Sequence, residues 1–449
     1  MKESIRVFLG REKPDGYYEK LIAELEKLNS RFRMFGSINR ELNSGLPFSV
    51  KDNICVKDVE STASSAILAG YTPPFNATAV ERLPKEEFGF LGKTKMDEFG
   101  FGTFGVNCKD HPLNPFDERY VTGGSSAGSA AATAVLKHHV SLSESTGGSI
   151  SSPAAFCGVV GFTPTYGLVS RYGLIDYANS LDKIGVMGRS AGDIRYVFEK
   201  IKGSDRYDTT CVDHPISKDG RKKLVIIDQL MKGVDQEILG SFDRTIDKLQ
   251  NMGYSVEHRS VPFLEKAIPA YYIVSMAEAS TNLAKYTGFK YGFKVSDFSR
   301  GYNEFFTEAR SNFSPEAKRR IVLGTFVRSA SVKSRYYEKA LKLRHMLIDA
   351  LDAILKDGFV ISPTKPIKAP TVKEAEEFDP LKEYGIDSIT IPPNFAGLPH
   401  VSFPSDYLNG MPVGTQIITN HFNDYSLLDF VEKWEEQFEY KFKYNVGAL

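Results

Sequence analysis

The sequence predicts an α/β fold in which a large mixed sheet is covered by helices on both faces. A buried apolar run at 223–229 is followed by helical spacing of Ile238, Phe242, Ile246 and Leu249, and an extended pattern returns at 254–261. This order of strand, helix and strand is typical of α/β proteins. Two further apolar runs, 358–364 and 412–420, are bounded by turn residues and predict more strands of the same sheet.

The remaining elements are expected to be helical. Apolar residues at helical spacing predict an amphipathic helix near the start of the chain, carried by Tyr18, Leu21, Ile22, Leu25 and Leu28. Residues 425–441 predict a helix at the other end. The sequence between about residues 262 and 350 has a mostly helical pattern and predicts an insertion over one sheet face. With no internal repeat or linker, we expect residues 1–449 to form a single domain.

The composition excludes several classes of protein. The chain has 449 residues, of which 42% are hydrophobic, so it can bury a large core. Lysine plus arginine equals aspartate plus glutamate, 56 against 56, so no bulk charge recruits nucleic acid or an anionic membrane. The four cysteines form no CxxC pair, and no His or Cys pair has metal-ligand spacing, so no metal is expected. Since a signal peptide and a long apolar run are absent, we expect a cytoplasmic protein outside the membrane.

Two glycine and serine segments, 122–139 and 143–153, are the most informative parts of the sequence. Gly123 and Gly128 have the separation of a phosphate loop, but Ser129 and Ala130 follow where that motif needs Lys and then Ser or Thr. Residues 124–128 fit the G-x-S-x-G pattern with Ser126 as nucleophile. That pattern also needs a downstream histidine as the base, and no histidine lies in a sequence context that identifies it as this base. A solvated loop whose serines cap neighbouring helices is a further interpretation.

Longer blocks resemble the amidase signature family. They are "VKDN" at 50–53, "GGSSAGSAAA" at 123–132 and "STGGSISSPAAFCGVVGFTPTYGLVSRYGL" at 145–174. The blocks "SLDKIG" at 180–185, "KRRIVLGTF" at 318–326 and "PPNFAGLPHVSFP" at 392–404 are similar to those of one branch, the A subunits of glutamyl-tRNA(Gln) amidotransferases. The likeness runs from about residue 15 to the end and implies the amidase-signature fold.

The resemblance also implies an activity and partners. Such A subunits hydrolyse glutamine, and the ammonia passes to the B subunit, which amidates the glutamate of Glu-tRNA(Gln) with ATP and Mg²⁺. A heterotrimer with the B and C subunits is expected, with no cofactor in this chain. Two other functions stay open, a free-standing amidase acting on another small amide and a catalytically silent assembly subunit.

The resemblance assigns the catalytic roles to one lysine and two serines. Ser149 attacks the amide, Ser125 relays the proton and Lys51 accepts it. A serine needs such a base, and lysine serves when it is uncharged, a form that burial favours. Because neighbouring side chains on a strand point to opposite faces, Asp52 is expected to face away from the site. The alternative for Lys51 is an ordinary solvated lysine.

Other residues are assigned to the oxyanion and to glutamine. The backbone N–H groups of Thr146, Gly147 and Gly148, followed by that of Ser149, are expected to surround the oxyanion. By resemblance, Arg320 binds the α-carboxylate, Asp387 binds the α-ammonium and Tyr271 makes a further contact. Arg320 has an alternative interpretation as a surface charge beside Lys318 and Arg319. Cys157 is interpreted as a small buried hydrophobe.

Three positions depart from the family's usual sequence. Ser145 and Ser151 stand where the family favours aspartate and arginine, and Lys95 stands where asparagine is more frequent. Losing an acid and a base together leaves no buried charge without a partner. The changes are therefore compatible with an intact site and also with reduced activity or altered specificity.

Overall fold

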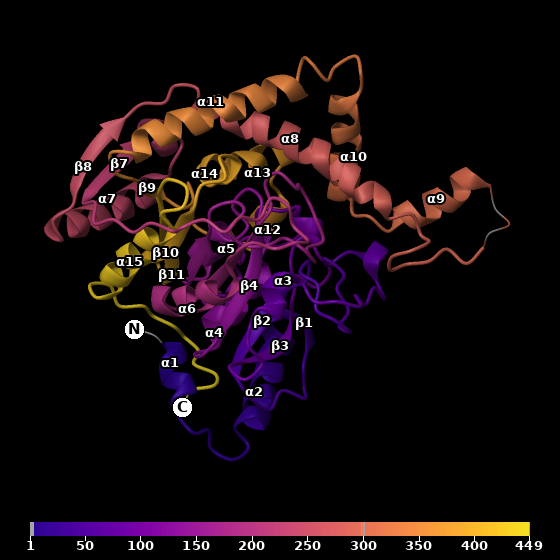
Figure 1. The fold of residues 1–449 in the computed structure, drawn as a ribbon, viewed down its shortest axis with the longest axis horizontal. Helices are drawn as coiled ribbons and strands as arrows, with labels where there is room; N and C mark the ends of the chain where they lie inside the picture. Colours follow the sequence, from indigo (N-terminus) through magenta and orange to yellow (C-terminus); the bar gives the residue numbers. More distant parts are fainter. Residues whose placement is uncertain (1–3, 298, 300, 449) are drawn as a thin grey trace.

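The computed structural model describes residues 4–297, 299 and 301–448, and an 11-stranded sheet lies at its centre (Figure 1). The strand order is β1-β3-β2-β4-β6-β5-β10-β11-β9-β7-β8. The strands are β1 (Phe35–Ile38), β2 (Leu46–Lys51), β3 (Phe88–Thr94), β4 (Val140–Ser145), β5 (Val160–Thr163), β6 (Lys183–Gly188), β7 (Lys223–Ile227), β8 (Ser255–Arg259), β9 (Phe359–Pro363), β10 (His400–Leu408) and β11 (Met411–Ile418). Strands β2, β3 and β4 pair in parallel, as do β7, β8 and β9, whereas the other pairs are antiparallel. The expected mixed sheet is confirmed.

Helices cover both faces of this sheet. They are α1 (Ser4–Leu9), α2 (Tyr17–Phe32), α3 (Thr78–Glu81), α4 (Ala127–Val135), α5 (Ser151–Phe156), α6 (Ala191–Ile201), α7 (Gln236–Asn251), α8 (Ala267–Asn282), α9 (Tyr302–Ser311), α10 (Pro315–Arg328), α11 (Tyr337–Leu355), α12 (Val372–Glu376), α13 (Pro380–Ile386), α14 (Ile391–Phe395) and α15 (Asp424–Glu435). On β6, Met187 packs with residues of α4 and α5, while the adjacent Val186 belongs to the cluster that contains α6 and α15. Since alternate strand residues face opposite sides, α4 and α5 lie across the sheet from α6 and α15.

The elements predicted from periodicity are present with small shifts in their ends. The amino-terminal helix is α2, which buries Leu21, Ile22 and Leu25. The predicted strand, helix and strand between 223 and 261 are β7, α7 and β8, and the runs at 358–364 and 412–420 contain β9 and β11. The predicted helix at 425–441 is α15, which ends earlier, at Glu435.

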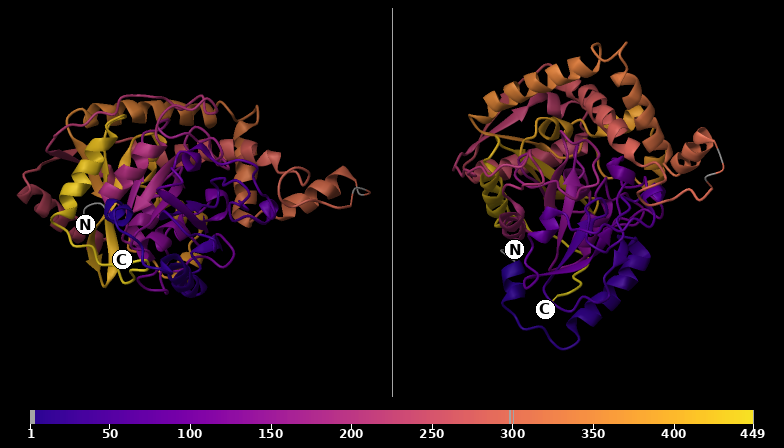
Figure 2. Two further views of the ribbon diagram at one scale, coloured as in Figure 1. Left: turned by 60° about the horizontal axis from the view of Figure 1, so that its bottom comes forward. Right: turned by 45° about the vertical axis from the view of Figure 1, so that its right-hand side comes forward.

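The stretch from 262 to 350 holds α8, α9, α10 and most of α11, and no strand is assigned in its described residues. Helix α8 packs against α10, α11 and α14. Figure 2 shows α9 extending away from the rest of the molecule, while α8 and α11 lie along the sheet layer. None of the described helices is both long and apolar enough to span a bilayer.

Candidate active site

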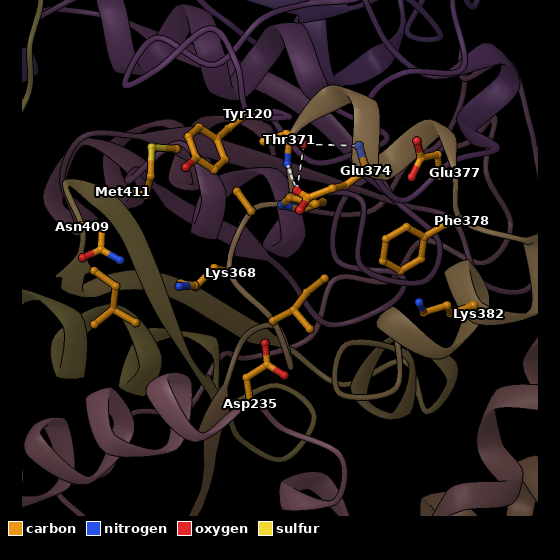
Figure 3. A pocket seen from close by; sticks show the side chains of 14 residues that line it. Tyr120, Asp235, Lys368, Thr371, Glu374, Glu377, Phe378, Lys382, Asn409 and Met411 are labelled. Carbon is orange, nitrogen blue, oxygen red and sulfur yellow. Dashed lines mark hydrogen bonds between the residues drawn. The ribbon is translucent and has the colours of Figure 1, made fainter.

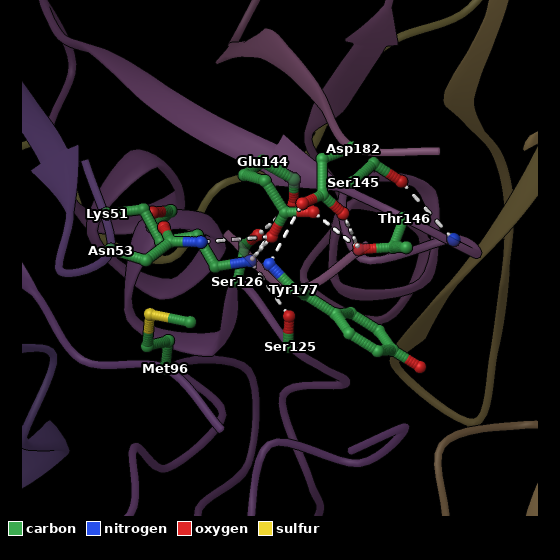
Figure 4. Close-up of polar contacts among 12 residues, drawn as sticks. Lys51, Asn53, Met96, Ser125, Ser126, Glu144, Ser145, Thr146, Tyr177 and Asp182 are labelled. Atoms are coloured by element: carbon green, nitrogen blue, oxygen red, sulfur yellow. Dashed lines mark hydrogen bonds and ion pairs between the residues drawn. The ribbon is translucent and has the colours of Figure 1, made fainter. Parts of the chain in front are cut away.

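Lys51 is the last residue of β2 and is completely buried. Its Nζ donates to Ser125 Oγ at 2.8 Å and to the backbone oxygen of Glu144 at 3.0 Å, and it pairs with Glu144 Oε2 at 2.9 Å (Figure 4). Glu144 lies on β4, which runs parallel to β2 and brings the two side chains together. The interpretation of Lys51 as a solvated lysine is therefore wrong. The structure brings two of the three catalytic candidates, Lys51 and Ser125, into direct contact.

Asp52 points away from this cluster, as strand alternation predicts. Its Oδ2 accepts hydrogen bonds from Thr62 and from the backbone of Ser64, and its Oδ1 lies 3.9 Å from Lys93 Nζ. The acid that contacts Lys51 is thus Glu144, which sequence reasoning did not select. Because an adjacent carboxylate favours the ammonium form of an amine, burial alone does not decide the charge of Lys51.

Glu144 shares the hydroxyl of Thr146 with a second buried acid, Asp182. Thr146 Oγ1 lies 2.7 Å from Glu144 Oε1 and 2.9 Å from Asp182 Oδ1 (Figure 4). A hydroxyl carries one proton, so only one of the two carboxyl groups accepts from it and the other must donate. Burial, followed by the nearby Glu144, raises the pKa of Asp182 well above its usual value. The raised pKa favours the protonated form of Asp182, in which Asp182 donates to Thr146 and Thr146 donates to Glu144.

The two glycine and serine segments meet at this cluster. The backbone N–H of Ser126 donates to the carbonyl of Ser149 at 3.2 Å. Ser125 is completely buried in the turn before α4, and the Gly124–Ser125 peptide is cis. Ser149 comes just before α5 and is 7% exposed. Ser149 lines the cavity described next.

A small cavity lies over Ser149. Its lining consists of glycines, polar side chains and tyrosines: Gly100, Gly102, Thr103, Gly124, Gly147, Gly148, Ser149, Tyr177, Tyr271, Tyr272, Arg320 and Asp387. The candidates for attack and for glutamine binding thus share one cavity. Lys51, Ser125 and Thr146 are buried next to it rather than lining it.

The glycines of the expected oxyanion turn are fixed by close packing. A Cβ on Gly147 would lie 2.4 Å from Tyr271 Oη, and one on Gly148 would lie 2.3 Å from Thr390 Oγ1. The N–H of Gly148 donates to Ser145 Oγ at 3.2 Å, and the Thr146 side chain turns toward the two acids. The structure thus brings these residues beside Ser149, with the Gly148 amide engaged by Ser145.

Arg320 lies on α10 and is 4% exposed, although Lys318 and Arg319 beside it are exposed. The interpretation of Arg320 as a surface charge is therefore wrong. Its Nε donates to Glu316 at 2.7 Å and its Nη1 donates to Tyr177 Oη. The guanidinium also lies 4.8 Å from the centre of the Phe101 ring. A guanidinium has five N–H donors, so donors remain for a carboxylate in the cavity.

Asp387 closes α13 and already has a cationic partner. Its Oδ1 accepts from Lys365 Nζ at 2.6 Å, and its Oδ2 accepts from Thr103 Oγ1 at 2.7 Å. The Lys365 side chain is 2% exposed and that of Asp387 is 15% exposed. Thr364 separates Lys365 from the end of β9, and Lys365 Nζ also donates to Ser152 Oγ at 3.2 Å.

The family model for amidases matches residues 17–428. The chain belongs to the amidase family. Among curated relatives, the A subunit of glutamyl-tRNA(Gln) amidotransferase from Methanospirillum hungatei is 41% identical over 401 residues, covering 88% of this chain and 93% of the relative. The protein of the same description from Pseudothermotoga lettingae is 40% identical over 408 residues, covering 88% and 86%.

Solved structures of amidases agree with the observed fold. The crystal structure of the glutamyl-tRNA(Gln) amidotransferase A subunit from Thermotoga maritima superposes with a TM-score of 0.82 at 31% identity, covering 97% of this chain and 94% of that one. A crystal structure described as an amidase gives a TM-score of 0.79 at 25% identity, covering 98% and 100%. The expected amidase-signature fold is confirmed, and this amidase-family chain is an enzyme homologous to amidotransferase A subunits.

The departures from the amidase family's usual sequence have different surroundings. Ser145 Oγ donates to Asn394 Oδ1 at 3.1 Å and accepts from Gly148, whereas the buried Ser151 Oγ has no hydrogen-bond partner in the described part of the chain. Lys95 Nζ donates to the carbonyl of Asp110 at the surface. Cys157 is completely buried, and burial raises the pKa of its thiol, so it behaves as the expected hydrophobe.

Sequence reasoning missed several residues of this amidase site, among them Glu144, Asp182, Lys365, Tyr177 and Thr103. No local pattern marked Glu144, because β4 has no apolar run. The available signal was Lys365, a charged residue that directly follows the predicted apolar run at 358–364. Tyr177 and Thr103 lie in loops without a distinctive pattern.

Two other features of this amidase-family structure take no part in the site. A more open surface pocket, lined by Tyr120, Lys368, Glu374 and Met411 among others, contains none of the candidate site residues (Figure 3). Within residues 4–297, 299 and 301–448, no group of three or more His, Cys, Asp or Glu side chains is arranged to hold a metal ion.

Proposed function

We propose that this chain is the glutamine-hydrolysing A subunit of a glutamyl-tRNA(Gln) amidotransferase. In this function it releases ammonia, which the B subunit uses with ATP and Mg²⁺ to amidate Glu-tRNA(Gln), in a complex that also contains a C subunit. The likeness to amidotransferase A subunits over most of the chain supports this assignment. ATP, Mg²⁺ and tRNA are assigned to the partner because glutamine hydrolysis requires none of them.

The proposed chemistry uses Ser149, Ser125 and Lys51. Ser149 Oγ attacks the side-chain carboxamide carbon of glutamine, its proton passes to Ser125 Oγ, and the proton of Ser125 passes to Lys51 Nζ. The same proton returns to the leaving nitrogen as the carbon–nitrogen bond breaks. Ammonia leaves, and a glutamyl ester on Ser149 remains for hydrolysis by water. Backbone N–H groups of the turn that precedes α5 stabilise the oxyanion.

Lys51 accepts a proton only when its amine is uncharged. Transfer of its own proton to Glu144 Oε2, which lies 2.9 Å away, meets this requirement. The transfer converts a buried ion pair into a neutral pair, and burial penalises charged groups more than neutral ones. Asp182 and Thr146 hold Glu144 in place for this exchange.

The observation that carries the proposal is the hydrogen bond from Lys51 to Ser125 next to a cavity that contains Ser149, Arg320 and Asp387. The groups proposed to bind the α-carboxylate, to bind the α-ammonium and to transfer the proton thus lie close to one nucleophile, Ser149. A silent assembly subunit would have no need to keep a completely buried lysine against a buried serine.

The test is ammonia release from glutamine by the chain together with the B and C subunits. Ser149→Ala is expected to lower this release by about 1,000-fold or more, because the nucleophile is lost. Added ammonia is expected to restore amidation of Glu-tRNA(Gln) in the variant complex, which shows that the complex is intact. Cys157→Ala is the matched control and should keep the wild-type rate. Unchanged ammonia release after Ser149→Ala would contradict the proposal.

A further inference from the structure

The carboxylate proposed for the α-ammonium of glutamine is occupied by a lysine of the same chain. Lys365 Nζ lies 2.6 Å from Asp387 Oδ1, and Thr103 Oγ1 donates to Asp387 Oδ2 at 2.7 Å. Both oxygens of Asp387 therefore have a donor before any ligand binds. Asp387 lines the cavity, whereas Lys365 reaches it from the protein side.

The position of Lys365 is fixed on several sides. Its side chain is 2% exposed, it follows the buried strand β9, and Ser152 Oγ on α5 accepts a second hydrogen bond from it at 3.2 Å. Moving this ammonium away from Asp387 would leave a buried cation without its anion, which is costly. A substrate ammonium entering the cavity must therefore share Asp387 with Lys365, and two cations near one carboxylate repel each other.

Arg320, which lines the same cavity, also has a resident partner, because its Nε pairs with Glu316 Oε1 at 2.7 Å. Arg320 uses Nε and Nη1 for Glu316 and Tyr177, and a guanidinium with five N–H donors retains others for a substrate carboxylate. The difference between the two sites is in what remains: Arg320 keeps N–H donors for a substrate carboxylate, whereas each oxygen of Asp387 already accepts from a donor and one of these donors is an ammonium.

We infer that Lys365 determines specificity in this cavity by competing with the substrate's α-ammonium for Asp387. The chain thereby accepts amides that carry a carboxylate but lack an α-amino group about as well as it accepts glutamine. This inference rests on the proposed glutaminase function and defines the substrate class of its site.

Binding to the full-length Ser149→Ala chain, alone and in the complex, tests the inference without turnover. The ligands are L-glutamine and 4-carbamoylbutanoate, which differ only in the α-amino group, and calorimetry gives both dissociation constants. With Lys365 present, we expect the two constants to agree within about 10-fold. With Lys365→Met added, we expect a shift of about 10- to 100-fold in favour of glutamine, the range of one charge-assisted hydrogen bond.

Two controls separate specificity from folding. Lys368→Met removes a nearby exposed lysine that pairs with Glu237, and it should leave the ratio unchanged. Lys365→Arg keeps a cation on Asp387 and should keep the ratio of the unsubstituted protein. If Lys365→Met does not fold, the ratio of the two dissociation constants in the protein that keeps Lys365 still tests the inference. A preference for glutamine of about 100-fold or more in that protein would overturn it. An unchanged ratio in folded Lys365→Met would also overturn it.

Failure of the proposed function has a different signature. If neither ligand binds and no amide yields ammonia in a Ser149-dependent way, the glutaminase assignment fails, and the specificity inference fails with it. If both ligands bind and only the ratio disagrees, the glutaminase assignment stands and Lys365 has no role in specificity.

Discussion

Lys51 lies between a hydroxyl and a carboxylate, and this position defines its chemistry. Ser125 Oγ, the Glu144 carbonyl and Glu144 Oε2 are its three hydrogen-bond partners. An ammonium has three N–H donors, so the charged form is fully satisfied, whereas the neutral amine offers a lone pair to the proton of Ser125. Glu144 therefore acts on the reaction through Lys51, as a positioning residue that shares its proton.

Replacement of Glu144 by glutamine tests this role at the residue scale. The amide oxygen of Glu144→Gln still accepts a hydrogen bond, but no negative charge remains to favour the ammonium of Lys51. We expect the acidic limb of the kcat/KM profile for glutamine to move to lower pH by about one unit or more, with a lower kcat. The measurement is ammonia release between pH 5 and 9.

The matched control for this variant is Glu435→Gln, which changes another buried carboxyl that does not line the cavity. Its pH profile should follow the wild type. An identical profile for Glu144→Gln and wild type would contradict the positioning role, because a purely structural contribution lowers kcat without moving the limb.

The residues named from the sequence and those found only in the structure differ in the kind of contact they make. Lys51, Ser125 and Ser149 stand in long blocks of recognisable sequence, and Arg320 and Asp387 follow from the same resemblance. Glu144 and Lys365 matter because of partners distant in the sequence, at positions 51 and 387. Such contacts depend on strand order and loop closure, which no local pattern contains.

At the scale of elements, periodicity predicted those with a strong apolar pattern. A strong apolar pattern is present in β7, α7, β8, β9 and β11, and the buried leucines of α2 have helical spacing. Strand β4 has the sequence VSLSES and is buried at every position, so its polar side chains hide it from a search for apolar runs. Ser141, Glu144 and Ser145 are hydrogen-bonded to neighbouring segments instead, whereas Ser143 Oγ has no partner among the described residues.

The contact between α15 and α6 gives a prediction about stability. Glu435 ends α15, and its Oε1 accepts from the backbone N–H of Ala191 at the start of α6 at 2.8 Å. Burial raises the pKa of Glu435 to about 8. Between the usual glutamate pKa and this value, the folded state binds more protons than the unfolded state, so stability falls as pH rises.

We expect the free energy of unfolding to fall by about 2 to 3 kcal/mol more in the wild type than in Glu435→Gln between pH 6 and pH 9. Urea unfolding at the two values measures both changes. Burial also lowers the pKa of Lys183 to about 7, which raises stability over part of this window, so only the difference between the two proteins isolates Glu435. An equal change in the free energy of unfolding between the two pH values for both proteins would exclude Glu435 as the titrating group.

At the scale of the whole molecule, the end of the chain is tied to its first half. Tyr17 Oη donates to the carbonyl of Gly447 at 2.9 Å, and Val446 forms a bridge with Leu136. Arg189, next to β6, donates to the carbonyls of Thr133 and Ala134 in α4 and to that of Tyr444. The carboxyl-terminal segment therefore supports α4, the helix that follows the turn holding Ser125.

Arg189→Ala is expected to destabilise the protein by about 3 kcal/mol or more, because the side chain is 2% exposed and its loss leaves several buried carbonyls without donors. Arg195→Ala is the comparison, since Arg195 is 23% exposed and pairs with Asp429 and Glu432 near the surface, where such pairs contribute less than about 1 kcal/mol. Urea unfolding gives both values. Hydrogen exchange should be faster at residues 438–448 and in α4 of Arg189→Ala only. Similar losses for the two variants, or protection unchanged in α4, would show that the carboxyl-terminal segment does not support the helix behind the catalytic turn.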